Sequence, residues 1–235
     1  MSVPLFFITE PLVGLITVTL DEDNSKHAIQ VLRLKMGNTV ELTDGKGQLA
    51  TASIVDDNRK HCRLQVQQLQ SIPRSSRQVT LAISLLKNRN RFEWLLEKVT
   101  ELGVTNIVPL LCDRTEKESA RFERMQSILQ SALLQSRQVW LPTLATPQEF
   151  GAIEKWKLQD GDHYIATCSD VAKQPLSLLA ATSKKNVLIC IGPEGDFTDD
   201  ELKIATKNNF VAVSLGSTRL RTETAGMVAV SLLAC

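Results

Sequence analysis

The chain of 235 residues lacks the long apolar run that a membrane protein would carry. A bilayer-spanning helix needs about 20 consecutive apolar residues, and no stretch approaches that length. The fairly apolar N-terminal segment has no basic start and is interrupted by Pro4, Glu10 and Pro11, which argues against a signal peptide. The apolar segment 225–235 is too short to span and fits a packed helix. These absences predict a cytoplasmic protein without a membrane partner.

Cysteine and histidine are scarce and scattered. The five cysteines and three histidines form no C-x-x-C pair and no zinc-type spacing. An odd number of dispersed cysteines is typical of reduced thiols inside a cell. We therefore expect no metal site, and a site assembled from residues distant in the sequence is the alternative that the spacing leaves open.

The net charge of +1 neither requires nor excludes a nucleic-acid partner. Residues 74–98, however, hold six Lys and Arg residues against two Glu residues. Such a cluster can neutralise phosphates, and on charge alone a solvated helix face explains it equally well. Aromatic residues make up only 5% of the chain, so the composition does not indicate that bases stack on aromatic side chains.

The first 72 residues are typical of short strands separated by turns. We expect strands over 6–8, 15–20, 39–42, 49–55 and 62–69. The segment Asp44–Gly47 predicts a hairpin turn, because both of its glycines accept positive φ. A short helix is expected over 26–33, with Ala28, Ile29 and Leu32 facing inward. The pattern predicts a small β-barrel domain over residues 1–72.

After a polar linker at 71–77, strands and helices alternate. We expect strands over 79–85, 104–111, 163–167, 186–191 and 211–215. Helices are expected over 91–102, 122–138, 147–156, 176–181, 198–207 and 222–234. Thr198 and Glu201 form a capping-box pattern at one helix start. The alternation predicts an α/β domain over 73–235, with a mostly parallel sheet covered on both faces.

Three loops follow predicted strands that end near Thr167, Ile191 and Leu215, where ligands bind beyond the carboxyl ends of parallel strands. Two of these loops carry notable motifs. The segment Gly192–Gly195 can press against a flat ligand, but no Gly-Lys-Ser/Thr follows it, so it is not a P-loop. An ordinary strand-to-helix turn is the alternative. The second loop, 215–225, is rich in ionisable and hydroxyl groups. Capping by Thr222 or Thr224 explains part of it, but not the two arginines that flank Leu220.

Several short motifs occur in one order along nearly the whole chain. They are His27 with Val31-Leu32-Arg33, Gly37, Asp44-Gly45, Lys87 to Glu93, Glu97 to Val104, Pro109 with Asp113-Arg114, Gln135-Ser136, Ile191 to Gly195, and Leu220 to Ala225. Together they resemble the bacterial 16S ribosomal RNA (uracil-N3) methyltransferases of the SPOUT superfamily. The last two motifs are the most specific of the set.

The chain departs from the pattern of that family at three places. Asp196 stands where the family usually has a second glycine, so the turn is expected to be tighter or differently charged. Thr218 stands where an arginine is common, and Arg219 where an aliphatic residue is common. Arg137 follows Gln135-Ser136 where a glycine is usual. The roles of Arg219 and Arg137 stay open.

The resemblance implies methylation of N3 of a uridine in 16S ribosomal RNA, with S-adenosylmethionine as the cofactor and methyl donor. It implies a homodimer, a C-terminal domain with a trefoil knot, and an RNA-binding PUA-like β-barrel in front. The substrate is expected to be 16S ribosomal RNA or the assembled small ribosomal subunit. Main-chain groups are expected to hold the cofactor bent, at Thr167, Ile191, Gly192, Pro193, Glu194, Gly195, Leu215, Gly216, Leu220, Thr222, Thr224 and Ala225.

The resemblance also suggests which side chains act. Arg221 is expected to stabilise the negative charge that develops on the uracil ring, and Glu223 to act as a base or an orienting partner. Helix capping with a salt bridge explains Glu223 equally well. Phosphate contacts are expected from Arg33, Lys87, Arg89 and Arg91.

Two other functions compete with this prediction. The first is a non-catalytic RNA-binding ribosome assembly factor with the same fold, which would not take up S-adenosylmethionine. The second is a nucleotide-using enzyme with a phosphate at Gly192–Gly195, in which ATP rather than S-adenosylhomocysteine would compete for the site.

Overall fold

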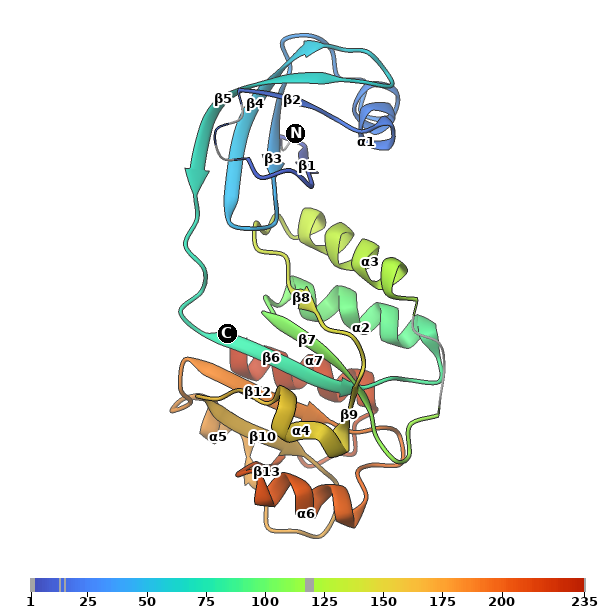
Figure 1. The fold of residues 1–235 in the computed structure, drawn as a ribbon, viewed down its shortest axis with the longest axis vertical. Coiled ribbons are helices and arrows are strands. Elements are labelled where there is room, and N and C mark those ends of the chain that lie inside the picture. The colour runs from blue at the N-terminus through green and yellow to red at the C-terminus, as the bar shows by residue number, and fades with distance from the viewer. Residues whose placement is uncertain (1–2, 13, 15, 117–120, 235) are drawn as a thin grey trace. The chain divides into compact units, whose positions relative to one another are not determined.

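The computed structural model describes residues 3–12, 14, 16–116 and 121–234 (Figure 1). The chain divides into two compact units. The first comprises Met1–Arg74 and Leu133–Leu141, and the second comprises Ser75–Ala132 and Pro142–Cys235. The chain therefore re-enters the first unit once after leaving it, a path that the alternation of strands and helices did not predict.

The first unit is built on a five-stranded sheet. Its strands, in spatial order, are β1 (Leu5–Phe7), β3 (Thr39–Thr43), β4 (Gln48–Asp56), β5 (Arg63–Ser71) and β2 (Thr17–Thr19). The β1–β3 pair is parallel and the other pairs are antiparallel. Alternate side chains of β3 and β4 are buried in one apolar core, which also holds Leu12, Leu20 and Leu64. All five predicted strands are present, and the part of the second that falls on Leu15 lies outside the described residues.

The predicted helix over 26–33 starts earlier and is less regular than expected. Helix α1 (Glu22–Lys26) begins at Asp21, whose carboxylate accepts a hydrogen bond from the Asn24 backbone N–H at 2.7 Å, and continues as a π-helical turn η1 (His27–Val31). The wider turn changes the direction of the following side chains. Ala28 is buried as predicted, but Leu32 is 38% exposed, so its predicted inward position is wrong.

The glycines of the predicted hairpin turn have two functions. Gly45 and Gly47 have φ values of +68° and +90°, which confirms the prediction. A Cβ at Gly47 would also clash with the Trp140 ring. The Gly47 N–H donates to the Val139 carbonyl, and the Leu141 N–H donates to the Gly45 carbonyl, both at 2.8 Å. The absence of side chains on the turn therefore lets the returning segment 133–141 dock on it.

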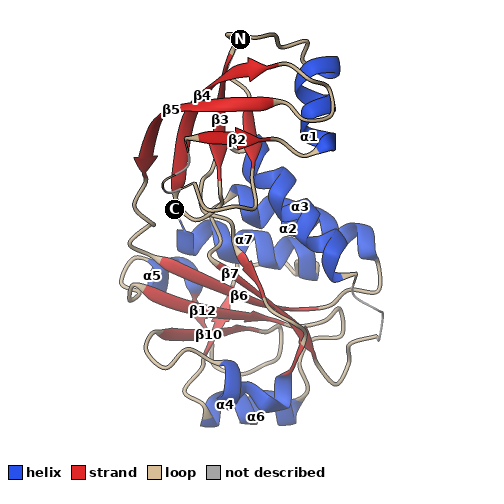
Figure 2. Ribbon diagram, turned by 45° about the horizontal axis from the view of Figure 1, so that its top comes forward, coloured by secondary structure: helices blue, strands red, loops and turns tan. Residues whose placement is uncertain are grey.

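The second unit contains an eight-stranded sheet in which every pairing of described residues is parallel (Figure 2). The spatial order is β11 (Gln174–Pro175), β13 (Val211–Ser214), β10 (Asp162–Ala166), β12 (Asn186–Ile191), β6 (Gln78–Ser84), β7 (Asn106–Leu111) and β8 (Thr143–Leu144), and β9 (Gln148–Glu149) pairs with β7. The inner strands are continuous apolar runs buried on both faces. The prediction of an α/β domain with a mostly parallel sheet is confirmed.

Helices cover both faces of this sheet (Figures 1 and 2). On one face α7 (Thr222–Ala234) packs against β6, β12, α2 (Arg89–Glu101) and α5 (Leu176–Ala180). A Cβ at Gly226 of α7 would lie 2.7 Å from Ile83 and 3.0 Å from Leu95, so the small residue permits this close approach. The other face carries α4 (Ile153–Trp156) and α6 (Asp199–Lys207). Helix α3 (Phe122–Gln135) follows β7 in the chain.

The prediction of a helix over 147–156 is wrong for the first half of that segment. Strand β9 pairs with the end of β7, and a 3-10 turn η2 (Phe150–Ala152) follows before the four residues of α4. The apolar residues Phe150, Ile153 and Trp156 recur every three residues, a pattern that a 3-10 turn and a short helix share. The two-residue strands β8 and β11 were not predicted, because two residues show no periodicity. Among the described residues, no helix is long and apolar enough to cross a membrane.

Candidate cofactor cavity

A cavity of about 700 Å³ lies at the carboxyl ends of β10, β12 and β13. Its walls are the segments 166–168, 191–194 and 213–222, together with Lys173, Asp196 and Ala225. This is the edge of a parallel sheet at which ligands bind in open α/β folds. The volume lies within the range of about 300–1,000 Å³ that small-molecule sites occupy.

The structure brings most of the predicted cofactor residues to this cavity. Ten of the twelve line it, and the two that do not are Gly195 and Thr224. A Cβ at Gly195 would instead meet the Arg114 side chain at 3.1 Å. The two glycine-bearing loops singled out in the sequence thus form walls of one cavity. Sequence reasoning missed Cys168 and Lys173, for which no motif gave a signal.

The turn between β12 and α6 is held tightly. A Cβ at Gly192 would lie 3.0 Å from the Phe197 ring, so this position has little room for a side chain. The Asp196 N–H donates to the Pro193 carbonyl at 3.0 Å, and Arg114 Nη1 donates to the Gly195 carbonyl at 2.6 Å. Arg114 belongs to the loop after β7, so this loop also supports the cavity wall.

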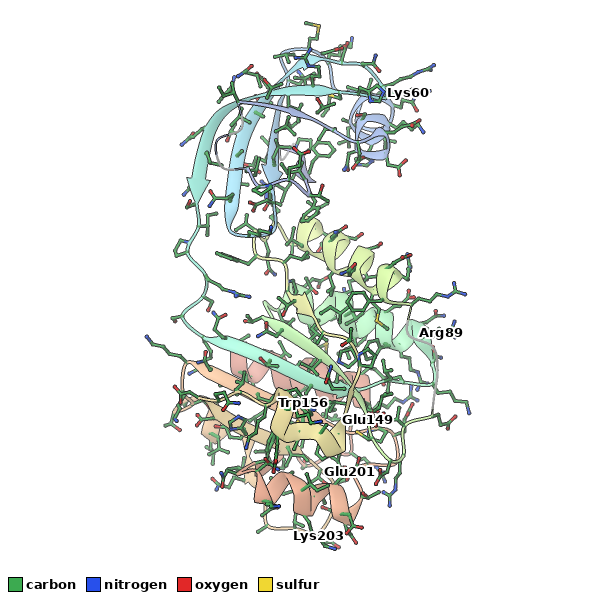
Figure 3. The ribbon with its side chains drawn as sticks, in the orientation of Figure 1. Lys60, Arg89, Glu149, Trp156, Glu201 and Lys203 are labelled. Carbon is green, nitrogen blue, oxygen red and sulfur yellow. The ribbon has the colours of Figure 1, made fainter. Side chains whose placement is uncertain are left out.

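The start of α6 reinforces the same wall. Thr198 and Glu201 form the predicted capping box. Glu201 is only 3% exposed and points from α6 toward the sheet, whereas Lys203 on the same helix points away (Figure 3). The Glu201 carboxylate accepts hydrogen bonds from the backbone N–H of Thr198 at 2.7 Å and of Asp113 at 3.0 Å. One buried carboxylate therefore joins the loops that follow β7 and β12.

The loop between β13 and α7 provides the opposite wall. Gly216 has φ +148°, and nothing lies within 4 Å of a Cβ at this position, so its backbone is open to the cavity. Leu215 and Leu220 are partly buried in the wall, and the neighbouring Arg219 and Arg221 are exposed and also line the cavity. The Ala225 N–H donates to the Arg221 carbonyl at 2.8 Å, which ties the end of the loop to α7. Two guanidinium groups therefore border this wall of the cavity.

Glu223 is buried on the side of α7 that does not line the cavity. Its Oε1 lies 3.7 Å from Nε of Arg91, and its Oε2 has no hydrogen-bond partner among the described residues. Its side chain is 8% exposed, against 39% for Arg91. Nearby, Thr222 and Ala225 do line the cavity. Glu223 therefore faces the start of α2.

Three of the four predicted RNA-contacting residues lie together at the start of α2. Asn88 caps this helix by accepting hydrogen bonds from the Asn90 and Arg91 backbone N–H groups. Lys87 precedes the cap and forms an ion pair with Glu116 at 2.8 Å, and Arg89 and Arg91 occupy the first turn. Arg33, the fourth, belongs to the other unit and has φ +56°.

The described cysteines, Cys62, Cys112, Cys168 and Cys190, carry no disulfide. Burial raises the pKa of Cys62 to about 11, and burial also raises the pKa of Cys112 and Cys190 well above the ordinary value. Cys168, by contrast, is exposed at the cavity. No group of three or more His, Cys, Asp or Glu side chains within the described ranges could hold a metal ion.

Comparison with known proteins agrees with this architecture. Residues 73–234 match the model of an RNA methyltransferase domain, and residues 20–67 match the model of an RNA methyltransferase PUA domain. The fold, the cavity and these matches thus define the class of protein. It is an RNA methyltransferase in which a PUA domain precedes the α/β domain along the sequence.

Relatives narrow the class to a family. The chain is 34% identical to "Ribosomal RNA small subunit methyltransferase E" of Synechocystis sp., over 92% of this chain and 72% of that protein. It is 30% identical to the protein of the same name from Mycobacterium bovis, over 97% and 90% of the two chains. The chain belongs to the ribosomal RNA small subunit methyltransferase E family, which confirms the family resemblance of its motifs.

Solved structures are similar over the whole length. A probable rRNA-methyltransferase from Porphyromonas gingivalis superposes with a TM-score of 0.89 at 32% identity and covers 99% of this chain and 98% of its own. Ribosomal RNA small subunit methyltransferase E from Neisseria gonorrhoeae, solved bound to S-adenosyl methionine, superposes with a TM-score of 0.87 at 28% identity and covers 98% and 96%.

Proposed function

We propose that this protein transfers the methyl group of S-adenosylmethionine to N3 of a uridine in 16S ribosomal RNA. Membership of the ribosomal RNA small subunit methyltransferase E family supports the reaction class. The observation that carries the proposal is the cavity at the ends of β10, β12 and β13, in a fold whose relative from Neisseria gonorrhoeae was solved with S-adenosyl methionine.

The residues of the cavity fit this cofactor. Its volume suits a ligand of this size, and Ile191, Leu215 and Leu220 give apolar walls for a flat base. The open backbone at Gly216 leaves main-chain groups accessible to the polar edge of an adenine. When bound, S-adenosylmethionine supplies an electrophilic methyl group on a positively charged sulfur.

We assign the electrostatic role in methyl transfer to Arg221. Uracil N3 must lose its proton, to a water molecule or a carboxylate, before or during the transfer, so negative charge develops on the two ring carbonyls. The exposed guanidinium at the cavity can donate hydrogen bonds to one of these oxygens and stabilise that charge. The rest of the acceleration is expected from holding the base in line with the methyl group, which can contribute up to about 7–11 kcal/mol.

Of the two roles considered for Glu223, its surroundings support the orienting one. The carboxylate faces Arg91 and lies outside the cavity wall, so it is poorly placed to remove a proton from a base bound there. We propose that it orients Arg91, which then contacts an RNA phosphate at the start of α2. The unpartnered Oε2 can accept a further hydrogen bond from the guanidinium or from a water molecule.

The remaining parts of the chain are proposed to recognise the RNA. We assign residues 1–72 to RNA binding as the PUA-like barrel and residues 73–235 to the methyltransferase domain. Phosphate contacts are assigned to Arg33, Lys87, Arg89 and Arg91. We further propose that the protein acts in the cytoplasm as a homodimer and that the C-terminal domain contains the trefoil knot of the superfamily.

The proposal is tested by incubating the protein with methyl-labelled S-adenosylmethionine and small ribosomal subunits that lack the modification. Label in 16S ribosomal RNA, mapped by nuclease digestion and mass spectrometry to N3 of one uridine, is the expected result. Naked 16S ribosomal RNA in a parallel reaction decides between the free RNA and the assembled subunit as substrate. Failure of calorimetry to detect S-adenosylmethionine binding would contradict the proposal and favour the non-catalytic assembly factor.

A further inference from the structure

Asp196 occupies a backbone conformation that favours glycine. Its φ is +63°, in the left-handed region, where a side chain is strained unless contacts compensate for it. Asp and Asn tolerate this region better than most residues, because their short side chains bond to nearby backbone groups. The residue also lines the cavity.

The carboxylate accepts three hydrogen bonds, and two of them come from another turn of the cavity. Oδ2 accepts from Thr167 Oγ1 at 2.9 Å and from the Cys168 backbone N–H at 2.7 Å. Oδ1 accepts from the Phe197 backbone N–H at 2.8 Å. The partners Thr167 and Cys168 follow β10, whereas Asp196 follows the neighbouring strand β12. One side chain thus joins the two turns that form adjacent walls of the cavity.

The turn at 167–169 is held on its other side as well. Lys173 Nζ donates to the Ser169 carbonyl at 2.6 Å, and the Ser169 N–H donates to Thr167 Oγ1 at 3.1 Å. Both Lys173 and Asp196 line the cavity. Opposite charges therefore fix the two ends of one short turn, which has no helix or strand of its own to hold it.

We propose that Asp196 is a positioning residue of the cofactor site, which fastens the turn 167–169 to the turn 192–197 and thereby sets the affinity for S-adenosylmethionine. This inference rests on the proposed function. Protein donors already engage both carboxylate oxygens, so the residue acts through the shape of the wall. Positioning groups of this kind raise affinity by ordering a loop before the ligand arrives.

Two substitutions separate the side chain's contacts from the conformation of the backbone. Glycine at 196 accepts φ +63° more easily than aspartate and removes all three hydrogen bonds. Asparagine also tolerates this φ but keeps only one oxygen acceptor. If Asp196 served only the backbone conformation of its own turn, replacing it by glycine would not weaken the binding of S-adenosylmethionine. Asp200→Asn is the matched control, because it removes the same charge from an exposed site on α6 that pairs with Lys203.

Affinity for S-adenosylmethionine is measured by calorimetry on the full chain. We expect Asp196→Gly to raise Kd at least about tenfold, the effect of losing one hydrogen bond to a charged group. Asp196→Asn should lie between this value and the wild type, and Asp200→Asn should match the wild type. In steady-state assays the KM for S-adenosylmethionine should rise with Kd, while kcat at saturating cofactor should change by less than about threefold, because bound cofactor restores the wall.

Cys168 gives a readout that does not depend on activity. It is the exposed one of the four described cysteines, and its backbone N–H is one of the groups that Asp196 holds. We expect N-ethylmaleimide to label Cys168 faster in Asp196→Gly than in the wild type, as measured by mass spectrometry of the peptide that contains it. Unfolding temperatures of the two proteins establish that the variant is folded.

The possible outcomes are distinct. If the wild type does not bind S-adenosylmethionine, the proposed function itself fails. If the wild type binds and Asp196→Gly binds within about twofold of it, with unchanged labelling of Cys168, the positioning role is overturned. If Asp196→Gly does not fold, Asp196→Asn decides the question by the same two measurements, and wild-type affinity in that variant overturns the inference.

Discussion

Removal of the Glu201 carboxylate should destabilise the second unit by a calculable amount. Glu201→Ala deletes the acceptor of two backbone N–H groups, those of Thr198 and Asp113, at 2.7 and 3.0 Å. A hydrogen bond to a charged group contributes about 1.5–3 kcal/mol, and a group left without a partner costs a similar amount. Asp113 is an exposed residue, so water can replace the carboxylate at its N–H, and this bond contributes at the lower end of the range.

We therefore expect the free energy of unfolding to fall by about 3 kcal/mol. For a unit of this size, 1 kcal/mol corresponds to about 2–4 °C, so the unfolding temperature should drop by about 6–12 °C. Urea unfolding followed by circular dichroism gives the free energy directly. Glu201→Gln, which keeps one oxygen acceptor, should lose about half as much, because its amide nitrogen cannot accept from the second N–H.

The control for this series is Asp200→Asn on the exposed side of α6, which should change stability by less than about 0.5 kcal/mol. If Glu201→Ala unfolds within about 1 kcal/mol of the wild type, the two hydrogen bonds do not stabilise the wall as argued. Because these bonds join the loops after β7 and β12, the affinity for S-adenosylmethionine should weaken together with stability.

Three further predictions concern the reaction, the RNA surface and the thiols. Arg221→Ala should lower kcat by about 100- to 1,000-fold with an unchanged unfolding temperature, because it removes a charge-stabilising donor from an exposed position; near-normal turnover in a methyl-transfer assay would reject this role. A variant in which alanine replaces Lys87, Arg89 and Arg91 should bind RNA more weakly and with a shallower dependence on salt, because fewer counterions are released. An unchanged slope in filter-binding titrations would remove these residues from the RNA surface. Burial raises the pKa of Cys62 to about 11, and thiols ionise near pH 8.5 in an unfolded chain. The unfolded state therefore binds fewer protons above that pH, and stability should fall between about pH 8.5 and 11; Cys62→Ser should show a smaller fall in urea titrations at successive pH values.

Local signals in the sequence predicted the elements that local interactions control. The capping box at Thr198 lies within four residues, and the structure contains it as predicted. Gly45 and Gly47 predicted the hairpin, because positive φ is a property of single residues. The apolar period of the segment 91–102 predicted a helix, which needs only its own spacing to be recognised. Where the period was shared by two structures, as over 147–156, the prediction failed.

The candidate cavity was predicted in outline for a related reason. The carboxyl ends of parallel strands meet at one edge, so loops that follow buried strands converge whatever their distance along the chain. The motifs within those loops then indicated the family. Of the two glycine-bearing loops, however, the sequence did not indicate which side chains face inward, and Gly195 and Thr224 lie outside the cavity wall.

Only the tertiary structure decided the contacts that join these loops. Asp196 and Cys168 are 28 residues apart, Glu201 and Asp113 are 88 apart, and Glu223 meets Arg91 across two helices. No short-range pattern encodes such pairs, because each depends on the order of strands in the sheet and on the packing of helices over it. By itself the sequence determined most of the elements, the sheet edge at which the cavity lies, and the family. The folded chain determined which carboxylates hold the walls in place, since a hydrogen bond forms only between groups that the fold brings within about 3 Å.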